Sequence, residues 1–156
     1  MYNRILVAVD DSDVAQFAVL EAARLAKCEG SKLRLVHILD EGVAYWGAGG
    51  PILDTVFEAM RNAGQAVLQR AVAVAAGAGI EADTTMPETV GQSAANIIVE
   101  EAKRWSAHLI VIGTHGRRGL EHLLLGSVAE GVVRLSSVPV LLVRKPSNET
   151  QAAATK

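Results

Sequence analysis

Short apolar runs alternate along this chain with longer stretches in which apolar residues return every three or four positions. The short runs predict strands buried on both faces, because they lack the polar alternation of a half-exposed strand. They are Ile5–Val9, Leu33–Leu39, Ile80–Met86 (the least apolar), Leu109–Gly113 and Val138–Val143. The longer stretches have the spacing of helices, so strands and helices are expected to alternate.

Four helices are predicted between these strands. The first carries its apolar face on Ala15, Ala18, Val19, Ala22, Leu25 and Ala26. The second runs from about Val56 to Val74 and is stopped by two glycines. The third and fourth cover Ala94–Trp105 and Ser127–Leu135. The segment Asp40–Leu53, which contains four glycines and Trp46, is predicted to be a loop.

This order of elements predicts an α/β fold. Apolar strands that alternate with helices form a parallel sheet covered on both faces, here an open, doubly wound, five-stranded, Rossmann-like sheet. Residues 1–145 are expected to form a single domain, and the polar and alanine-rich tail 146–156 is expected to be disordered. Ligands of such sheets bind beyond the carboxyl ends of the strands, where the strand order reverses.

A glycine-rich segment follows the fourth predicted strand and leads to the fourth helix. Its sequence is Gly113-Thr-His-Gly116-Arg-Arg-Gly119, followed later by Gly126-Ser127. Glycines let backbone N–H groups approach an anion, and a helix N-terminus adds unpaired donors, so the segment favours phosphate binding. Ser127 and Glu130 have the spacing of a capping box. The alternative is a turn that only reverses the chain.

Asp10 ends the first predicted strand and is expected to face the same crevice as the glycine-rich segment. A ligand contact is favoured for its carboxylate. The alternative is that Asp10 is only an acid at the start of the first helix, a role that Asp11, Ser12 and Asp13 share, with Ser12 or Asp11 as the cap.

Three segments of the chain resemble the universal stress protein family of the nucleotide-binding type. The family motif Gly-x2-Gly-x9-Gly-Ser/Thr is filled by Gly113, Gly116, Gly126 and Ser127. The opening Ile-Leu-Val-Ala-Val-Asp-Asp-Ser and the later Leu-Val-His-Ile are similar to the family's first two strands. The resemblance covers nearly the whole chain, apart from the variable segment that contains Trp46.

This resemblance implies an adenine nucleotide site. Ala8, Val9 and Ile38 would line the adenine pocket, Asp10 and Gly113 would hold the ribose, and Gly116, Gly126 and Ser127 would hold the phosphates. The full implied set is Ala8, Val9, Asp10, Ile38, Ile112, Gly113, His115, Gly116, Arg117, Gly126, Ser127 and Val128. The cofactor would be ATP with Mg²⁺ or Mn²⁺ held through the phosphates, without direct metal ligands from the protein.

The resemblance also implies a role and an assembly. The expected function is that of an ATP-binding stress-response protein that acts by sensing or signalling as a homodimer, paired through Val138–Val143. The alternatives are a slow ATP hydrolase using the same pocket and a dimeric interaction module without nucleotide turnover. No catalytic residue is assigned, and His115 is expected to be a polar loop residue near the phosphates.

The composition narrows the classes of function. Fifteen basic and seventeen acidic residues give a net charge of -2, which argues against a broad nucleic-acid surface. The single Cys28 suits a reducing, cytoplasmic compartment and is expected to be a small buried residue at a helix end. The first apolar run is too short for a secretory signal, and no run approaches the length of a membrane span.

Other nucleotide and metal sites lack their motifs. The sequence contains neither a P-loop motif nor a nucleophile elbow, and its first strand–helix turn is not glycine-rich. A phospho-receiver is disfavoured because no Asp follows Asp83. His108 and His122 lack metal-ligand spacing. His37 is predicted to be a core or rim residue, and Trp105 a core residue.

Overall fold

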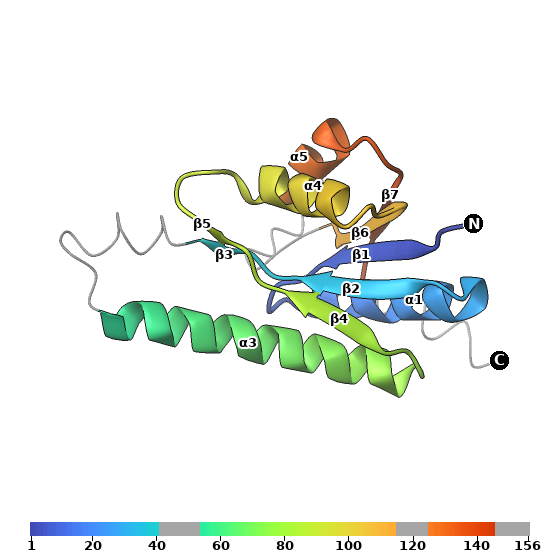
Figure 1. Ribbon diagram of the computed structural model, residues 1–156, viewed down its shortest axis with the longest axis horizontal. Coiled ribbons are helices and arrows are strands. Elements are labelled where there is room, and N and C mark those ends of the chain that lie inside the picture. Colours follow the sequence, from blue (N-terminus) through green and yellow to red (C-terminus); the bar gives the residue numbers. More distant parts are fainter. Residues whose placement is uncertain (41–53, 115–124, 146–156) are drawn as a thin grey trace.

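The computed structural model describes residues 1–40, 54–114 and 125–145, and residues 41–53, 115–124 and 146–156 lie outside the described residues. In chain order, the elements are β1 (Arg4–Ala8), α1 (Asp13–Glu29), β2 (Lys32–Val36), β3 (Leu39–Asp40), α3 (Asp54–Gly77), β4 (Ala82–Thr85), β5 (Glu88–Thr89), α4 (Ala94–Arg104), β6 (Leu109–Gly113), α5 (Ser127–Leu135) and β7 (Val140–Val143). Figure 1 shows the main sheet between two helical layers.

The main sheet has the strand order β4-β2-β1-β6-β7, and every neighbouring pair is parallel. The chain winds outward from β1 to β2 and β4, then crosses back through α4 to β6 and β7. The strand order therefore reverses between β1 and β6. The predicted doubly wound, five-stranded parallel sheet is confirmed.

Alternate residues of the central strands face opposite helical layers. Ile5 and Val7 belong to the core cluster that includes residues of α1 and α3. Leu6 and Ile110 belong to the cluster that includes residues of α4 and α5. Figure 1 shows α1 and α3 on one side of the sheet and α4 and α5 on the other. The apolar positions predicted for α1 are buried, apart from Leu25, which is half-buried.

A second, two-stranded parallel sheet was not predicted. It joins β3 to β5, with Leu39 opposite Glu88 and Asp40 opposite Thr89. Asp40 is therefore a strand residue, whereas the sequence analysis assigned it to a loop. A two-residue strand is too short to show a periodic pattern, so only the folded chain reveals the pairing. An ion pair between Arg61 of α3 and Glu88 ties this small sheet to α3.

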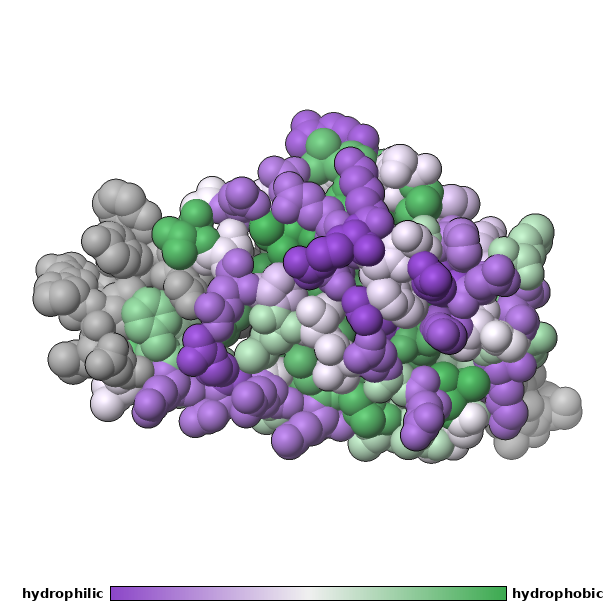
Figure 2. Space-filling model, viewed as in Figure 1, coloured by the Kyte–Doolittle hydropathy of each residue, from purple (hydrophilic) through white to green (hydrophobic). Residues whose placement is uncertain are grey.

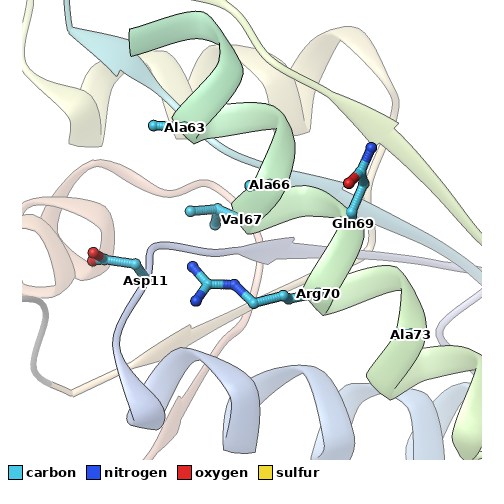
Figure 3. A pocket seen from close by; sticks show the side chains of 7 residues that line it. All are labelled: Asp11, Ala63, Ala66, Val67, Gln69, Arg70 and Ala73. Atoms are coloured by element: carbon cyan, nitrogen blue, oxygen red, sulfur yellow. The ribbon is translucent and has the colours of Figure 1, made fainter. Parts of the chain in front are cut away.

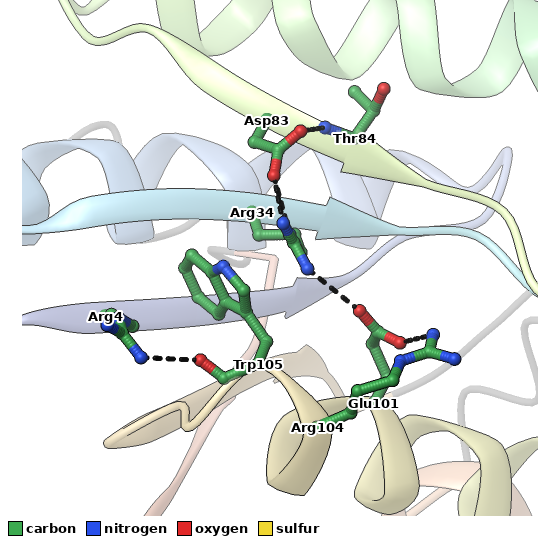
Figure 4. A network of polar contacts seen from close by, with 7 residues as sticks. All are labelled: Arg4, Arg34, Asp83, Thr84, Glu101, Arg104 and Trp105. Carbon is green, nitrogen blue, oxygen red and sulfur yellow. Dashed lines mark hydrogen bonds and ion pairs between the residues drawn. The ribbon is translucent and has the colours of Figure 1, made fainter.

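A charged network lies on the α4 face of the sheet, at its β4 side (Figure 4). Glu101 of α4 is only 2% exposed and forms ion pairs with Arg34 of β2, at 3.1 Å, and with Arg104. Arg34 also pairs with Asp83 of β4 and lies 4.7 Å from the ring centroid of Trp105. Because an unpaired buried carboxylate is costly, both guanidinium groups are needed to bury Glu101. Figure 2 shows hydrophilic residues gathered between α4 and the strands.

Two sequence expectations about single residues are wrong. Cys28 lies at the end of α1 as expected, but it is exposed, because it lies off the alanine-lined face of that helix. Trp105 is half-buried and packs against the core cluster that contains residues of α4 and α5, instead of lying inside it. It is the C-cap residue of α4, and its carbonyl accepts a hydrogen bond from Arg4 at 3.0 Å.

The contact between α4 and α5 depends on a glycine. A Cβ atom built on Gly131 of α5 would lie 2.6 Å from the Cβ of Ala95 in α4, closer than carbon atoms approach in folded proteins. We expect Gly131→Ala to lower the free energy of unfolding by about 1–3 kcal/mol through overpacking, although alanine is the better helix former. Urea denaturation measures this change.

The double variant provides the control for this prediction. Ala95→Gly removes the methyl group that the new Cβ would meet, so Ala95→Gly with Gly131→Ala should be more stable than the sum of the two single effects predicts. Additive effects would show that these two positions do not contact each other.

Candidate functional site

The carboxyl ends of three central strands lie side by side. Ala8 of β1 is in register with Val36 of β2 on one side and with Ile112 of β6 on the other. The residues that follow these three therefore meet at the same edge of the sheet, next to the reversal of strand order. The structure brings together there seven of the residues expected for the site: Ala8, Val9, Asp10, Ile38, Ile112, Gly113 and Gly126.

Asp10 is held by the start of α1. Its Oδ1 atom accepts hydrogen bonds from the backbone N–H of Ser12, at 3.0 Å, and from the Ser12 hydroxyl. Ser12 is the N-cap of α1, and its Oγ accepts a hydrogen bond from the N–H of Ala15 at 3.2 Å. Capping is therefore performed by Ser12, and Asp10 lies before the helix. The half-buried Asp10 carboxylate is oriented through one oxygen only.

The acid in the first turn of α1 is Asp13. Its Oδ2 accepts a hydrogen bond at 2.9 Å from Lys145, which follows β7. This hydrogen bond and the charge of the Lys145 ammonium lower the pKa of the Asp13 carboxyl, so the group stays ionised. The start of α1 is thereby tied to the far edge of the sheet, and Asp10 is not needed to compensate the helix dipole.

The N-terminus of α5 is held at the carboxyl end of β6. The N–H of Gly126 donates to the carbonyl of Thr114 at 2.7 Å, and the N–H of Thr114 donates to the carbonyl of Val143 at 2.9 Å. Gly126 is the N-cap residue of α5 and has no side-chain capping bond. The predicted capping box is therefore wrong: Ser127 is the first helical residue, and the backbone N–H of Glu130 bonds the carbonyl of Gly126.

This helix terminus is suited to an anion. The first backbone N–H groups of a helix lack intrahelical acceptors, and the N-terminal end of the helix carries partial positive charge. A glycine cap supplies no side-chain oxygen for these groups. Ser127 and Val128 are exposed, while Ile112 and Gly113 are buried in the strand that leads to the helix. The first two residues of α5 are therefore exposed beside the end of β6.

His37 lies directly after β2 and is buried, which confirms the predicted core or rim position. Its Nδ1 atom lies 2.9 Å from the carbonyl oxygen of Val9, the residue before Asp10. Ile38 is half-buried and follows at the same edge of the sheet. Val9 is buried, and the His37 ring holds its carbonyl at the end of β1.

A groove of about 560 Å³ lies beside the start of α1 (Figure 3). It is lined by Asp11, Ala63, Ala66, Val67, Gln69, Arg70 and Ala73. Figure 3 shows the Arg70 side chain of α3 extending toward Asp11. Arg70 and Gln69 were not predicted as site residues, because they lie on the polar face of a predicted helix and match no motif.

Several expected site residues cannot be placed. His115, Gly116 and Arg117 lie outside the described residues, as do His122 and Trp46. Among residues 1–40, 54–114 and 125–145, no group of three or more His, Cys, Asp or Glu side chains is arranged to hold a metal ion. No helix in the described part of the chain is long and apolar enough to cross a membrane.

Similarity to known proteins identifies the family of this chain. The model of the Universal stress protein family matches residues 1–144. The chain belongs to this family. Universal stress protein MJ0531 of Methanocaldococcus jannaschii is 35% identical over 149 residues, which cover 96% of this chain and 86% of that protein.

Two solved structures of universal stress proteins contain a nucleotide. One is a universal stress protein in complex with cAMP, with a TM-score of 0.64 and 29% identity, covering 92% of this chain and 97% of the other. The other is the universal stress protein from Archaeoglobus fulgidus in complex with dAMP, with a TM-score of 0.65 and 29% identity, covering 91% and 98%. Both share the family and the fold of this chain.

Proposed function

We propose that this universal stress protein binds ATP at the carboxyl ends of β1, β2 and β6 and acts in stress response as a homodimer, by nucleotide-dependent sensing or signalling. The observation that carries the proposal is the N-terminus of α5. It is held against the end of β6, and its cap is a glycine without a side-chain bond. Related proteins that bind cAMP and dAMP support an adenine nucleotide as the ligand.

In this proposal each part of the nucleotide is assigned to residues at or after the strand ends. The first N–H groups of α5 would bind phosphate oxygens, and Gly116 and Ser127 would assist. Asp10 would accept a hydrogen bond from a ribose hydroxyl, with Gly113 beside it. The base would lie against Ala8, Val9 and Ile38, where Val9 is buried and Ile38 half-buried.

A divalent cation fits this arrangement. The carboxylates of Asp10 and Asp11 lie at the end of β1, so the site contains negative charge besides that of the phosphates. Mg²⁺ or Mn²⁺ bound to the phosphate oxygens would reduce this repulsion, since Mg²⁺ is commonly held through substrate phosphates. Within the described residues, the donor set for a dedicated protein cage is absent.

The first prediction of this proposal is a phosphate requirement. ATP should bind more tightly than adenosine, because the α5 terminus acts only on phosphate oxygens. Gly126→Val would place methyl groups where the backbone must approach phosphate, so we expect it to abolish ATP binding while the fold remains. Isothermal titration calorimetry measures both affinities.

Gly77→Val is the matched control for this prediction. Gly77 ends α3, is exposed, and a Cβ built there meets nothing within 4 Å. The variant should bind ATP as the wild type does. Equal affinity of the wild type for ATP and adenosine would contradict the phosphate assignment.

The second prediction concerns the sugar. A hydrogen bond to a charged group contributes about 1.5–3 kcal/mol, so Asp10→Ala should weaken ATP binding about tenfold or more, and Asp10→Asn should weaken it less. Ser12→Ala removes the hydroxyl bond to Oδ1 of Asp10 but keeps the bond from the backbone N–H, so it should weaken binding by a smaller factor. Wild-type affinity of Asp10→Ala would show that its carboxylate does not touch the nucleotide.

Ser93→Ala separates this effect from helix capping. Ser93 is the N-cap of α4, and its Oγ accepts a hydrogen bond from the N–H of Asn96 at 3.3 Å. Ser12→Ala and Ser93→Ala should each cost about 1 kcal/mol of stability as lost caps. Only Ser12→Ala should change the affinity for ATP, because among the described residues Ser93 forms no hydrogen bond with Asp10.

The proposed dimer uses the β7 edge of the sheet. In the parallel register, the N–H of Ile110 donates to the carbonyl of Pro139, which leaves the N–H groups of Val140 and Leu142 directed to the open side. Leu141 and Leu142 are each 38% exposed. An apolar edge of this kind favours pairing with a second copy about a two-fold axis.

The opposite edge of the sheet is blocked. Asp83 places a charge on β4, and its Oδ1 accepts a hydrogen bond at 2.8 Å from the backbone N–H of Thr84. The register with β2 directs this N–H away from the sheet, so a donor that a partner strand would need is already occupied. The two edges therefore differ in their ability to pair.

Proline substitutions at the two edges test the dimer. Val140→Pro removes an outward donor without breaking a β6–β7 hydrogen bond, so we expect it to shift the protein toward monomer. Thr84→Pro removes the equivalent donor on the other edge and should leave the dimer intact. Sedimentation velocity at micromolar concentration measures both, and a monomeric wild type would contradict the proposal.

A further inference from the structure

The ladder of hydrogen bonds between β1 and β2 ends one bond earlier than its register would allow, at the carboxyl ends of the two strands. Ala8 is opposite Val36, and the N–H of Val9 donates to the carbonyl of Val36 at 2.9 Å. The alternation of a parallel ladder then places the next hydrogen bond between the N–H of Ile38 and the carbonyl of Val9. Within the described residues that bond is not formed, and the Ile38 N–H has no hydrogen-bond acceptor.

The side chain of His37 takes the place of the missing bond. Its Nδ1 atom lies 2.9 Å from the carbonyl oxygen of Val9. A carbonyl oxygen only accepts hydrogen bonds, so Nδ1 carries the hydrogen. The Val9 carbonyl thus accepts a hydrogen bond from the His37 ring, where a regular ladder would have the backbone N–H of Ile38.

Packing and backbone bonds fix the ring in this position. His37 is 8% exposed, and a Cβ built on Gly64 of α3 would lie 2.9 Å from its Cδ2 and 2.7 Å from Sδ of Met86. The backbone N–H of His37 donates in the other direction, to Thr85 at 3.2 Å. The glycine in α3 therefore provides the space that the ring needs.

We propose that His37 is a positioning residue of the nucleotide site, which rests on the ATP-binding function proposed above. Its ring bonds the Val9 carbonyl in place of the Ile38 N–H and leaves that N–H available to the base. An N–H donor distinguishes bases: adenine presents an unprotonated ring nitrogen where guanine presents an N–H. The geometry points to His37 as a determinant of base selectivity.

The test is the ratio of the dissociation constants for GTP and ATP in His37→Phe. The phenyl ring keeps the packing against Gly64 but cannot donate, so the Ile38 N–H is expected to bond Val9. We expect the ratio to fall about three- to tenfold, the effect of one hydrogen bond, because ATP affinity falls while GTP affinity does not. A purely structural role would weaken both nucleotides equally, and an unchanged ratio would overturn the proposal.

Two further variants keep the test decisive if His37→Phe does not fold. Gly64→Ala presses on the ring from α3 and should lower the same ratio while His37 is still present. Met86→Leu alters the packing around Gly64 without removing the bond to Val9 and should leave the ratio unchanged. A lowered ratio in Met86→Leu, or an unchanged one in Gly64→Ala, would count against the ring bond.

NMR tests the geometry without any nucleotide. Nitrogen-15 spectra should show the His37 hydrogen on Nδ1, and the Ile38 amide should exchange faster in the wild type than in His37→Phe. A hydrogen on Nε2 with none on Nδ1, or equal exchange rates, would overturn the inference. If the spectra agree but the wild type binds neither nucleotide, the proposed function fails and base selection with it, while the ladder geometry stands.

Discussion

The central strand β1 is the constraint on which the rest of this structure depends. It is paired in parallel with β2 on one side and with β6 on the other, so that Ala8 is opposite Val36 and Ile112. Parallel pairing brings the carboxyl ends of all three strands to the same edge, and the right-handed crossovers place the reversal of strand order there. The residues after each strand therefore meet at one edge of the sheet, although they lie up to about 100 positions apart in the sequence.

Different interactions stabilise the α4–α5 layer and determine how the two edges of the sheet are exposed. The α4–α5 layer depends on close contact at Gly131 and on the buried carboxylate of Glu101, which two arginines hold. At the edges, β4 is protected by the charge and hydrogen bond of Asp83, while β7 presents apolar side chains. This asymmetry makes one edge of the sheet suited to a second copy and the other unsuited.

At the carboxyl ends of the central strands, hydrogen bonds from within the protein hold the polar groups in place. Asp10 is oriented by Ser12 through one carboxylate oxygen. The α5 terminus is bonded to Thr114 through Gly126 and carries no side-chain cap. The ring of His37 holds Val9 in place of a backbone bond. Such preorganisation lowers the ordering cost when a ligand binds.

The sequence by itself determined the order of strands and helices, the two-sided burial of the sheet and the family, because these depend on local periodicity and on a motif of fixed spacing. It also predicted that Asp10 and Gly113 would lie at one crevice. The Gly126 cap, the exposed Cys28, the β3–β5 pairing and the ring bond of His37 were decided only by the tertiary structure. Each depends on which distant backbone or side-chain group lies opposite, and a local pattern of apolar and polar residues does not contain that information.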